Sequence, residues 1–131
     1  MQTFLPYADF TESAKCLDYK RLGKQRVEAW QIYQIVSGKR TKGGWINHPA
    51  VNMWGFSNLL AYYYNDILDE WIKRGYKNNM EYIICPPSVT EPFWLGDKDF
   101  HDSHKSNLLR KDSKFYKKYN WKVPDNLAYV W

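Results

Sequence analysis

The stretch from Leu17 to Val36 reads LDYKRLGKQRVEAWQIYQIV, and its residues change from basic to apolar along its length. In a helix, residues three, four and seven apart share a face. That spacing places Arg21, Lys24, Gln25 and Glu28 on one side. The later half, AWQIYQIV, supplies enough apolar side chains to bury against a core, so the stretch is expected to form the helix around which the fold is built.

The carboxylate of Glu28 has two interpretations. A carboxylate on a basic face of a buried helix is a candidate catalytic group. The alternative is an ion pair with Lys24, one turn earlier, which would contribute only about 0.2–0.5 kcal/mol to stability. Spacing alone favours the ion pair, so a catalytic role needs support from other observations.

The helix that contains this stretch is expected to cover about Phe10–Ser37. Asp9 followed three residues later by Glu12 resembles a capping box, and Gly38 is a natural left-handed stop. Gly23 inside the helix costs roughly 1 kcal/mol relative to alanine. It permits either close approach to the helix backbone by a partner or only a slight bend.

A second helix is expected from about Pro49 to Arg74. Residues 47–49, Asn-His-Pro, predict its start, because proline is favoured in the first turn of a helix. The apolar stripe that follows includes Phe56 and steps by three and four, which predicts a core helix that ends at Gly75.

Segment 76–96 is expected to be irregular, because its three prolines forbid a long helix. We expect it to pack over the core through its Phe93-Trp94-Leu95 sequence. Asp97 or Asp99 can cap a third helix that continues to about residue 111, with a further turn through residue 119.

Composition bounds the class of protein. With 131 residues, 44% hydrophobic and 18% aromatic, the chain is expected to form one compact all-α domain over residues 1–131, with three main helices and irregular connections. No apolar run reaches the roughly 18–20 residues that span a bilayer. The start, MQTFLPYADF, lacks the features of a secretory signal. We therefore expect an intracellular monomer, in the cytoplasm or nucleoid, or in a host cell if the source is viral.

A few side chains could bind a metal ion. His101 and His104 are three residues apart on the expected third helix, and His48 or Cys85 could join them. The usual histidine zinc motif has i,i+4 spacing with a glutamate between, which is absent, so we expect no metal and no cofactor. Cys16 and Cys85 do not form a CxxC pair and are expected to be buried free thiols.

The positive charge is concentrated in two segments. The net charge is +5, and residues 18–42 and 105–122 each contain seven Lys or Arg residues. This distribution suits nucleic acid, with ordinary solvated helix faces as the alternative. The basic loop 39–45 is either a connector or a phosphate contact. In segment 115–121, FYKKYNW, the aromatics could stack on bases or dock into the core.

Four segments together resemble a known family: LDYKRLGKQRVE, SGKRTKGGWINHP, WIKRGY and SNLLRKDSKFYKKY. In order and spacing they are similar to the pyrimidine-dimer DNA glycosylases of the endonuclease V type, most of all to short bacterial and viral relatives. The resemblance covers roughly residues 1–119 apart from the Pro-rich loop. It implies a compact all-α fold and a DNA repair enzyme that flips a damaged or modified nucleotide out of the duplex.

The resemblance also implies a mechanism. In this family the N-terminal α-amine attacks the sugar carbon that bears the damaged base, an imine forms, and β-elimination cuts the strand. Gln2 is large enough to leave Met1 in place, so Met1 would supply the amine, and the essential glutamate of the family falls on Glu28. A free α-amine has a pKa near 7.7–8.0, so a good fraction is nucleophilic at neutral pH.

DNA would be held by basic side chains. Arg21 and Lys24 correspond loosely to basic helix positions of the family, and Arg110 and Lys111 to those of its third helix. The other residues expected at the DNA are Arg26, His48, His104, Lys114, Lys117 and Lys118. Two alternatives to a glycosylase with lyase activity stay open: a nucleic-acid-binding domain without chemistry, and a metal-dependent hydrolase that uses His48, His101 and His104.

Overall fold

The computed structural model describes residues 2–55 and 58–131. Within these ranges there is no strand, which confirms the all-α fold, and no helix is long and apolar enough to cross a membrane. The elements are α1 (Phe10–Cys16), α2 (Tyr19–Val36), α3 (Pro49–Asn52), α4 (Leu59–Lys73), α5 (Lys98–Lys111), α6 (Ser113–Tyr116) and the 3₁₀ turn η1 (Lys117–Tyr119).

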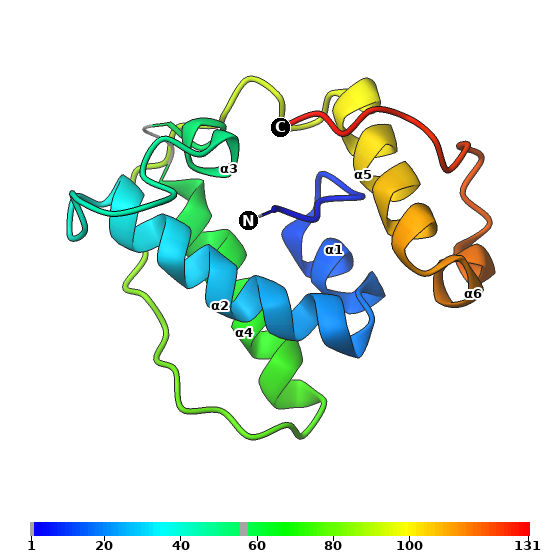
Figure 1. The fold of residues 1–131 in the computed structure, drawn as a ribbon. Coiled ribbons are helices and arrows are strands. Elements are labelled where there is room, and N and C mark those ends of the chain that lie inside the picture. The colour runs from blue at the N-terminus through cyan, green and yellow to red at the C-terminus, as the bar shows by residue number, and fades with distance from the viewer. Residues whose placement is uncertain (1, 56–57) are drawn as a thin grey trace.

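The helices surround the N-terminal segment (Figure 1). Helix α4 packs against both α1 and α2, while α5 stands on the other side of residues 2–8. The C-terminal segment, residues 120–131, returns along α5 and ends near the start of the chain (Figure 1). Tyr129 of this segment bonds the backbone of Thr3, so the C-terminal segment lies against the N-terminal segment.

The helix expected over Phe10–Ser37 is two helices in the structure. Leu17 and Asp18 separate α1 from α2 and are extended. Leu17 is fully buried, and the Asp18 N–H donates a 3.0 Å hydrogen bond to the Tyr116 hydroxyl, which in turn donates to the Asp18 carboxylate. Tyr116 lies 98 residues further along the chain, so a tertiary contact creates this corner.

The helix expected over Pro49–Arg74 also divides. Gly55, between α3 and α4, has a φ of 51°, which a right-handed helix cannot accommodate. Trp54 is buried in the core against Trp94, with 5.0 Å between ring centroids. Burial of Trp54 thus directs the chain inward after one turn of α3. Phe56, part of the expected stripe, lies outside the described residues.

Helix ends follow local sequence more closely. The carboxylates of Asp9 and Asp97 each accept a backbone N–H in the first turn of α1 and α5. Gly38 and Gly75 follow the ends of α2 and α4 with φ values of 81° and 86°. The expected third helix and the extra turn after Asp112 are confirmed as α5, α6 and η1.

Helices α2 and α4 approach closely at Gly23. A Cβ atom at this position would lie 3.0 Å from Cζ3 of Trp71. The glycine therefore lets the indole ring of α4 lie against the backbone of α2, which decides between the two roles expected for it.

Segment 76–96 is irregular, as expected, and runs around α4 (Figure 1). The Asn65 side chain holds it by accepting from Ile83 N–H at 2.9 Å and donating to Ile83 C=O at 2.8 Å. Trp94 is buried, but Phe93 is 94% exposed. The expectation that Phe93 packs over the core is therefore wrong.

Candidate active site

The carboxylate of Glu28 lies against the N-terminal segment. The backbone N–H of Gln2 donates to its Oε2 at 3.0 Å. The side-chain amide of Gln25 donates to the Gln2 carbonyl at 2.7 Å and lies 3.4 Å from Glu28 Oε2. Among the described residues Glu28 forms no ion pair with Lys24. Its carboxylate instead accepts hydrogen bonds from Gln2 and Gln25.

The C-terminal segment holds the next residue. Thr3 N–H donates to the Tyr129 hydroxyl at 3.2 Å, and that hydroxyl donates to the Thr3 carbonyl. Met1, the expected nucleophile, lies outside the described residues. Met1 is joined by its peptide bond to the nitrogen of Gln2, and the hydrogen on this nitrogen is the one donated to Glu28.

His48 is linked to this site through the charge of Glu28. Its Nδ1 accepts the Ala50 N–H at 3.0 Å and caps α3, so Nε2 carries the proton of the neutral ring. Burial lowers the pKa of His48, and the negative charge of Glu28 opposes this shift. The ring is 5.1 Å from the rings of both Trp45 and Trp131. Trp45 is 53% exposed and has a φ of 78°.

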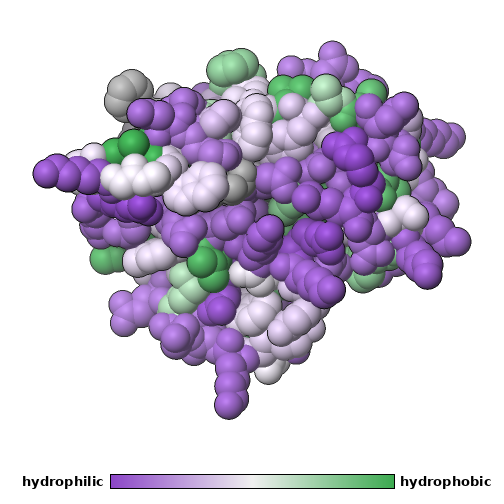
Figure 2. Space-filling model, in the orientation of Figure 1, coloured by the Kyte–Doolittle hydropathy of each residue, from purple (hydrophilic) through white to green (hydrophobic). Residues whose placement is uncertain are grey.

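A basic hollow of about 220 Å³ is lined by Phe4, Lys20, Arg21, Lys24 and Lys111. Burial, together with the positive charges of Lys24 and Arg21, lowers the pKa of Lys111. An anion such as a phosphate would relieve this repulsion. The face over α2 and α5 is mostly hydrophilic (Figure 2).

A family model described as pyrimidine dimer DNA glycosylase matches residues 1–84. The chain belongs to the pyrimidine dimer DNA glycosylase family. The match includes α1 to α4 and the face of α2 that presents Glu28, while α5, α6 and the C-terminal segment lie beyond it. Comparison with curated proteins and with solved structures gave no match.

Membership of the pyrimidine dimer DNA glycosylase family makes DNA the substrate and confirms the resemblance seen in the sequence. Of the expected DNA-binding residues within the match, Arg21 and Lys24 line the basic hollow, and the negative charge of Glu28 acts on the pKa of His48. Lys111, beyond the match, completes the basic hollow.

Two other residues expected to contact DNA, Arg26 and Arg110, bind to groups of the protein itself. The guanidinium of Arg26 lies 4.6 Å from the Trp71 ring and donates to Asn78 Oδ1 at 2.9 Å, on the other flank of α2. Arg110 donates to two carbonyls of the C-terminal segment, those of Asp125 and Leu127. These contacts give both arginines structural partners.

Three expected lysines remain in solvent. Lys114, Lys117 and Lys118 are exposed on α6 and η1. The aromatic residues between them turn inward: Tyr116 is fully buried, and Trp121 stacks on it with 5.8 Å between ring centroids. The segment therefore docks its rings into the protein while its lysines form an exposed basic surface.

His104, expected at the DNA, is instead fully buried. Its Nδ1 accepts the Leu5 N–H and its Nε2 lies beside the Val130 carbonyl, both at 2.9 Å. His101 lies 2.8 Å from the Leu5 carbonyl through Nδ1 and accepts the Gly96 N–H at its Nε2. This burial argues against a direct contact between His104 and DNA, because the ring belongs to the core.

The same bonds argue against the metal-dependent alternative. Burial lowers the pKa of His101 and lowers that of His104 to about 3, so both rings are neutral. Each uses its lone pair for a backbone N–H and has none left for a metal ion. The described part of the chain contains no group of three or more potential ligands, and Cys16 and Cys85 are free thiols, the second only half-buried.

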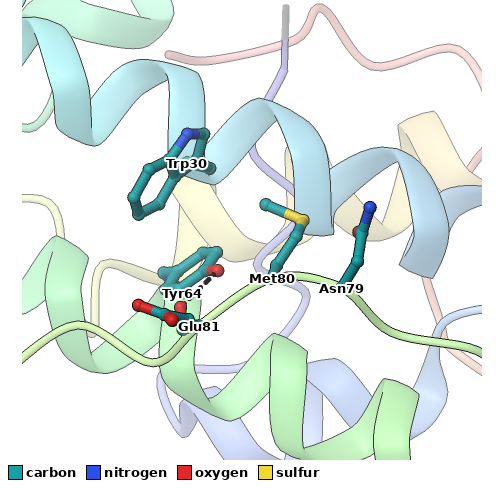
Figure 3. Close-up of a pocket in the computed structure, with 5 residues that line it drawn as sticks. All are labelled: Trp30, Tyr64, Asn79, Met80 and Glu81. Carbon is teal, nitrogen blue, oxygen red and sulfur yellow. Dashed lines mark hydrogen bonds between the residues drawn. The ribbon is translucent and has the colours of Figure 1, made fainter.

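A separate pocket lies on the other flank of α2 (Figure 3). It has a volume of about 350 Å³ and is lined by Trp30, Tyr64, Asn79, Met80 and Glu81. The Tyr64 hydroxyl donates to the Glu81 carbonyl at 2.8 Å, as the dashed line shows. None of these residues contributes to the site around Glu28.

Sequence reasoning missed several residues of the site. Lys20 lies one turn before Lys24, and this spacing was a signal for the basic hollow. Tyr63 and Tyr129 gave no such signal, because each reaches the N-terminal segment from a distant part of the chain.

Proposed function

We propose that this member of the family is a DNA glycosylase with associated AP lyase activity. The contact between Gln2 N and Glu28 Oε2 carries the proposal, because it brings the start of the chain to the carboxylate of the basic face. A pyrimidine dimer or a modified base is the proposed lesion.

In the proposed first step, the uncharged α-amine of Met1 attacks C1′ of the damaged nucleotide. The bond from C1′ to the base breaks, and the base leaves with the electron pair and takes up a proton. Opening of the sugar ring then gives a protonated imine between the amine and C1′. Glu28 stabilises this positive charge and assists the proton transfers.

Strand cleavage follows from the same intermediate. A proton-accepting group (a general base) removes the proton at C2′. The electrons of that C–H bond form a double bond between C2′ and C3′, and the phosphate on C3′ leaves. Water then hydrolyses the imine and frees the amine. This sequence needs no metal or cofactor.

DNA would lie across the basic hollow and the Glu28 carboxylate. The phosphates of one strand would occupy the basic hollow of Lys20, Arg21, Lys24 and Lys111, where the cations repel one another without an anion. Exposed lysines of α6 and η1 would extend this contact: Lys114, Lys117 and Lys118. His48, on which the charge of Glu28 acts, would face the sugar or base.

Borohydride trapping tests the proposal. The protein is mixed with a duplex that contains one abasic site, and separately with ultraviolet-irradiated duplex, and is then reduced. A covalent adduct mapped to the Met1 amine is expected. A matched control carries extra residues before Met1, which removes the amine from the site and should abolish trapping.

A different outcome would support the second candidate. Tight, salt-sensitive DNA binding without any adduct would indicate a nucleic-acid-binding domain that has the scaffold without the chemistry.

A further inference from the structure

Residues 2–5 are held by side chains from distant parts of the chain. An extended segment normally satisfies its backbone groups in a sheet, and here side chains of α2, α4, α5 and the C-terminal segment replace the neighbouring strands. The side chains that bond this segment are Gln25, Glu28, Tyr63, His101, His104 and Tyr129.

Tyr63 and Gln25 lie beneath the contact with Glu28. Both are 1% exposed. The Tyr63 hydroxyl donates to Gln25 Oε1 at 2.5 Å, and it lies 3.3 Å from the Phe4 carbonyl. Gln25 then donates through Nε2 to the Gln2 carbonyl at 2.7 Å.

The orientation of the Gln25 amide follows from its neighbours. The Gln2 carbonyl and Glu28 Oε2 are both acceptors, so the NH₂ group must face them. The amide oxygen is thereby directed at the Tyr63 hydroxyl. Tyr63 thus fixes the amide that holds both the N-terminal backbone and the carboxylate.

We propose that Gln25 and Tyr63 are positioning residues, which hold Gln2, and with it the start of the chain, against Glu28. The inference rests on the proposed function. Neither side chain has to touch the substrate, because each is buried and acts through Gln2 or Glu28. Displacement of reacting groups by about 1 Å can lower a rate about 100-fold, so the loss of this support should reduce the chemical step.

The chain offers a matched pair of variants. Tyr63→Phe removes the hydroxyl that bonds Gln25, and Tyr64→Phe removes a buried tyrosine hydroxyl from the next residue of α4, where it bonds the Glu81 carbonyl. The two substitutions delete the same atom from the same helix. Only the first removes a bond to the N-terminal segment.

The rate of borohydride trapping on abasic duplex is measured under single-turnover conditions, with DNA affinity and Tm measured alongside. Tyr63→Phe is expected to slow trapping about 10-fold or more with DNA affinity unchanged. Tyr64→Phe should stay within about twofold of the wild type. Equal rates for the two variants would overturn the inference, whereas absence of trapping by the wild type would overturn the proposed function itself.

A second variant distinguishes positioning from general stability. Gln25→Glu places a carboxylate beside Glu28, and only its protonated form can donate to the Gln2 carbonyl. Trapping by this variant should therefore recover as the pH falls from 8 to 6, relative to the wild type at each pH. A constant ratio across that range would contradict the role of Gln25.

Discussion

His104 holds the backbone of Leu5 from a position 99 residues further along the chain: the Leu5 N–H donates to His104 Nδ1 at 2.9 Å. His101 lies 2.8 Å from the carbonyl of the same residue. Because each ring accepts one backbone N–H, both histidines must stay neutral for these bonds to persist. The N-terminal segment is therefore coupled to the protonation of two buried rings.

Stability should fall as the pH is lowered below about 6.5. The folded pKa of His101 and His104 lies below the usual value, that of His104 at about 3, so the unfolded chain binds more protons in this range. The stabilisation of the folded protein by each neutral histidine ring is fully present above the pKa that the histidine has in the unfolded chain. It decreases by about 1.4 kcal/mol per pH unit for each histidine as the pH falls from that value toward the pKa in the folded protein.

Urea unfolding between pH 7 and 5 measures this effect. Burial raises the pKa of Asp66 to about 6, which acts in the opposite sense, so the Asp66→Asn variant provides the background. If the free energy of unfolding of the Asp66→Asn variant does not change between pH 7 and 5, the conclusion that His101 and His104 are held neutral in the folded protein is wrong.

Replacement of Glu28 by Gln should abolish strand cleavage, because the amide cannot balance the charge of the imine. The expected loss is about 100-fold or more, with DNA affinity retained. Single-turnover cleavage of abasic duplex checks the rate. The control is Glu81→Gln, an exposed glutamate on the other flank of α2, and equal activity of the two variants would remove Glu28 from the mechanism.

Charge removal from the basic hollow should flatten the salt dependence of DNA binding. Lys20, Lys24 and Lys111 are replaced together by Ala, and the slope of log K against log [salt] is expected to decrease by about 1 for each phosphate that the variant no longer neutralises. The same change at the exposed Lys73 and Lys77 is the control. If the variant of the basic hollow and the control variant have the same salt slope, the DNA phosphates do not bind in the basic hollow.

The lysines of α6 and η1 are tested separately. Replacement of Lys114, Lys117 and Lys118 by Ala should also flatten the salt slope, because all three are exposed and free of carboxylate partners among the described residues. An unchanged slope would limit the footprint to the basic hollow.

Gly23→Val should destabilise the protein by about 1–3 kcal/mol. A Cβ atom at Gly23 already lies 3.0 Å from Trp71, and the branched side chain adds further overlap. Thermal or urea unfolding measures the change. Gly44→Val, at a position with no heavy atom within 4 Å of a Cβ, is the control and should be close to neutral.

Local sequence determined four helix ends in this protein: the starts of α1 and α5 and the ends of α2 and α4. The caps by Asp9 and Asp97 and the left-handed Gly38 and Gly75 could be predicted because each depends on atoms a few residues away. The face of α2 that presents Glu28 also followed from its helical spacing, and the resemblance of the sequence to its family pointed to that glutamate.

Tertiary structure decided the rest. The corner at Asp18 depends on Tyr116, and the burial of His104 depends on Leu5, contacts that span 98 and 99 residues. Helical spacing alone left two interpretations of Glu28 open, an ion pair with Lys24 and a catalytic role. Only the folded chain brings Gln2 to that carboxylate, because no local rule links a helix face to a segment held by three other parts of the molecule.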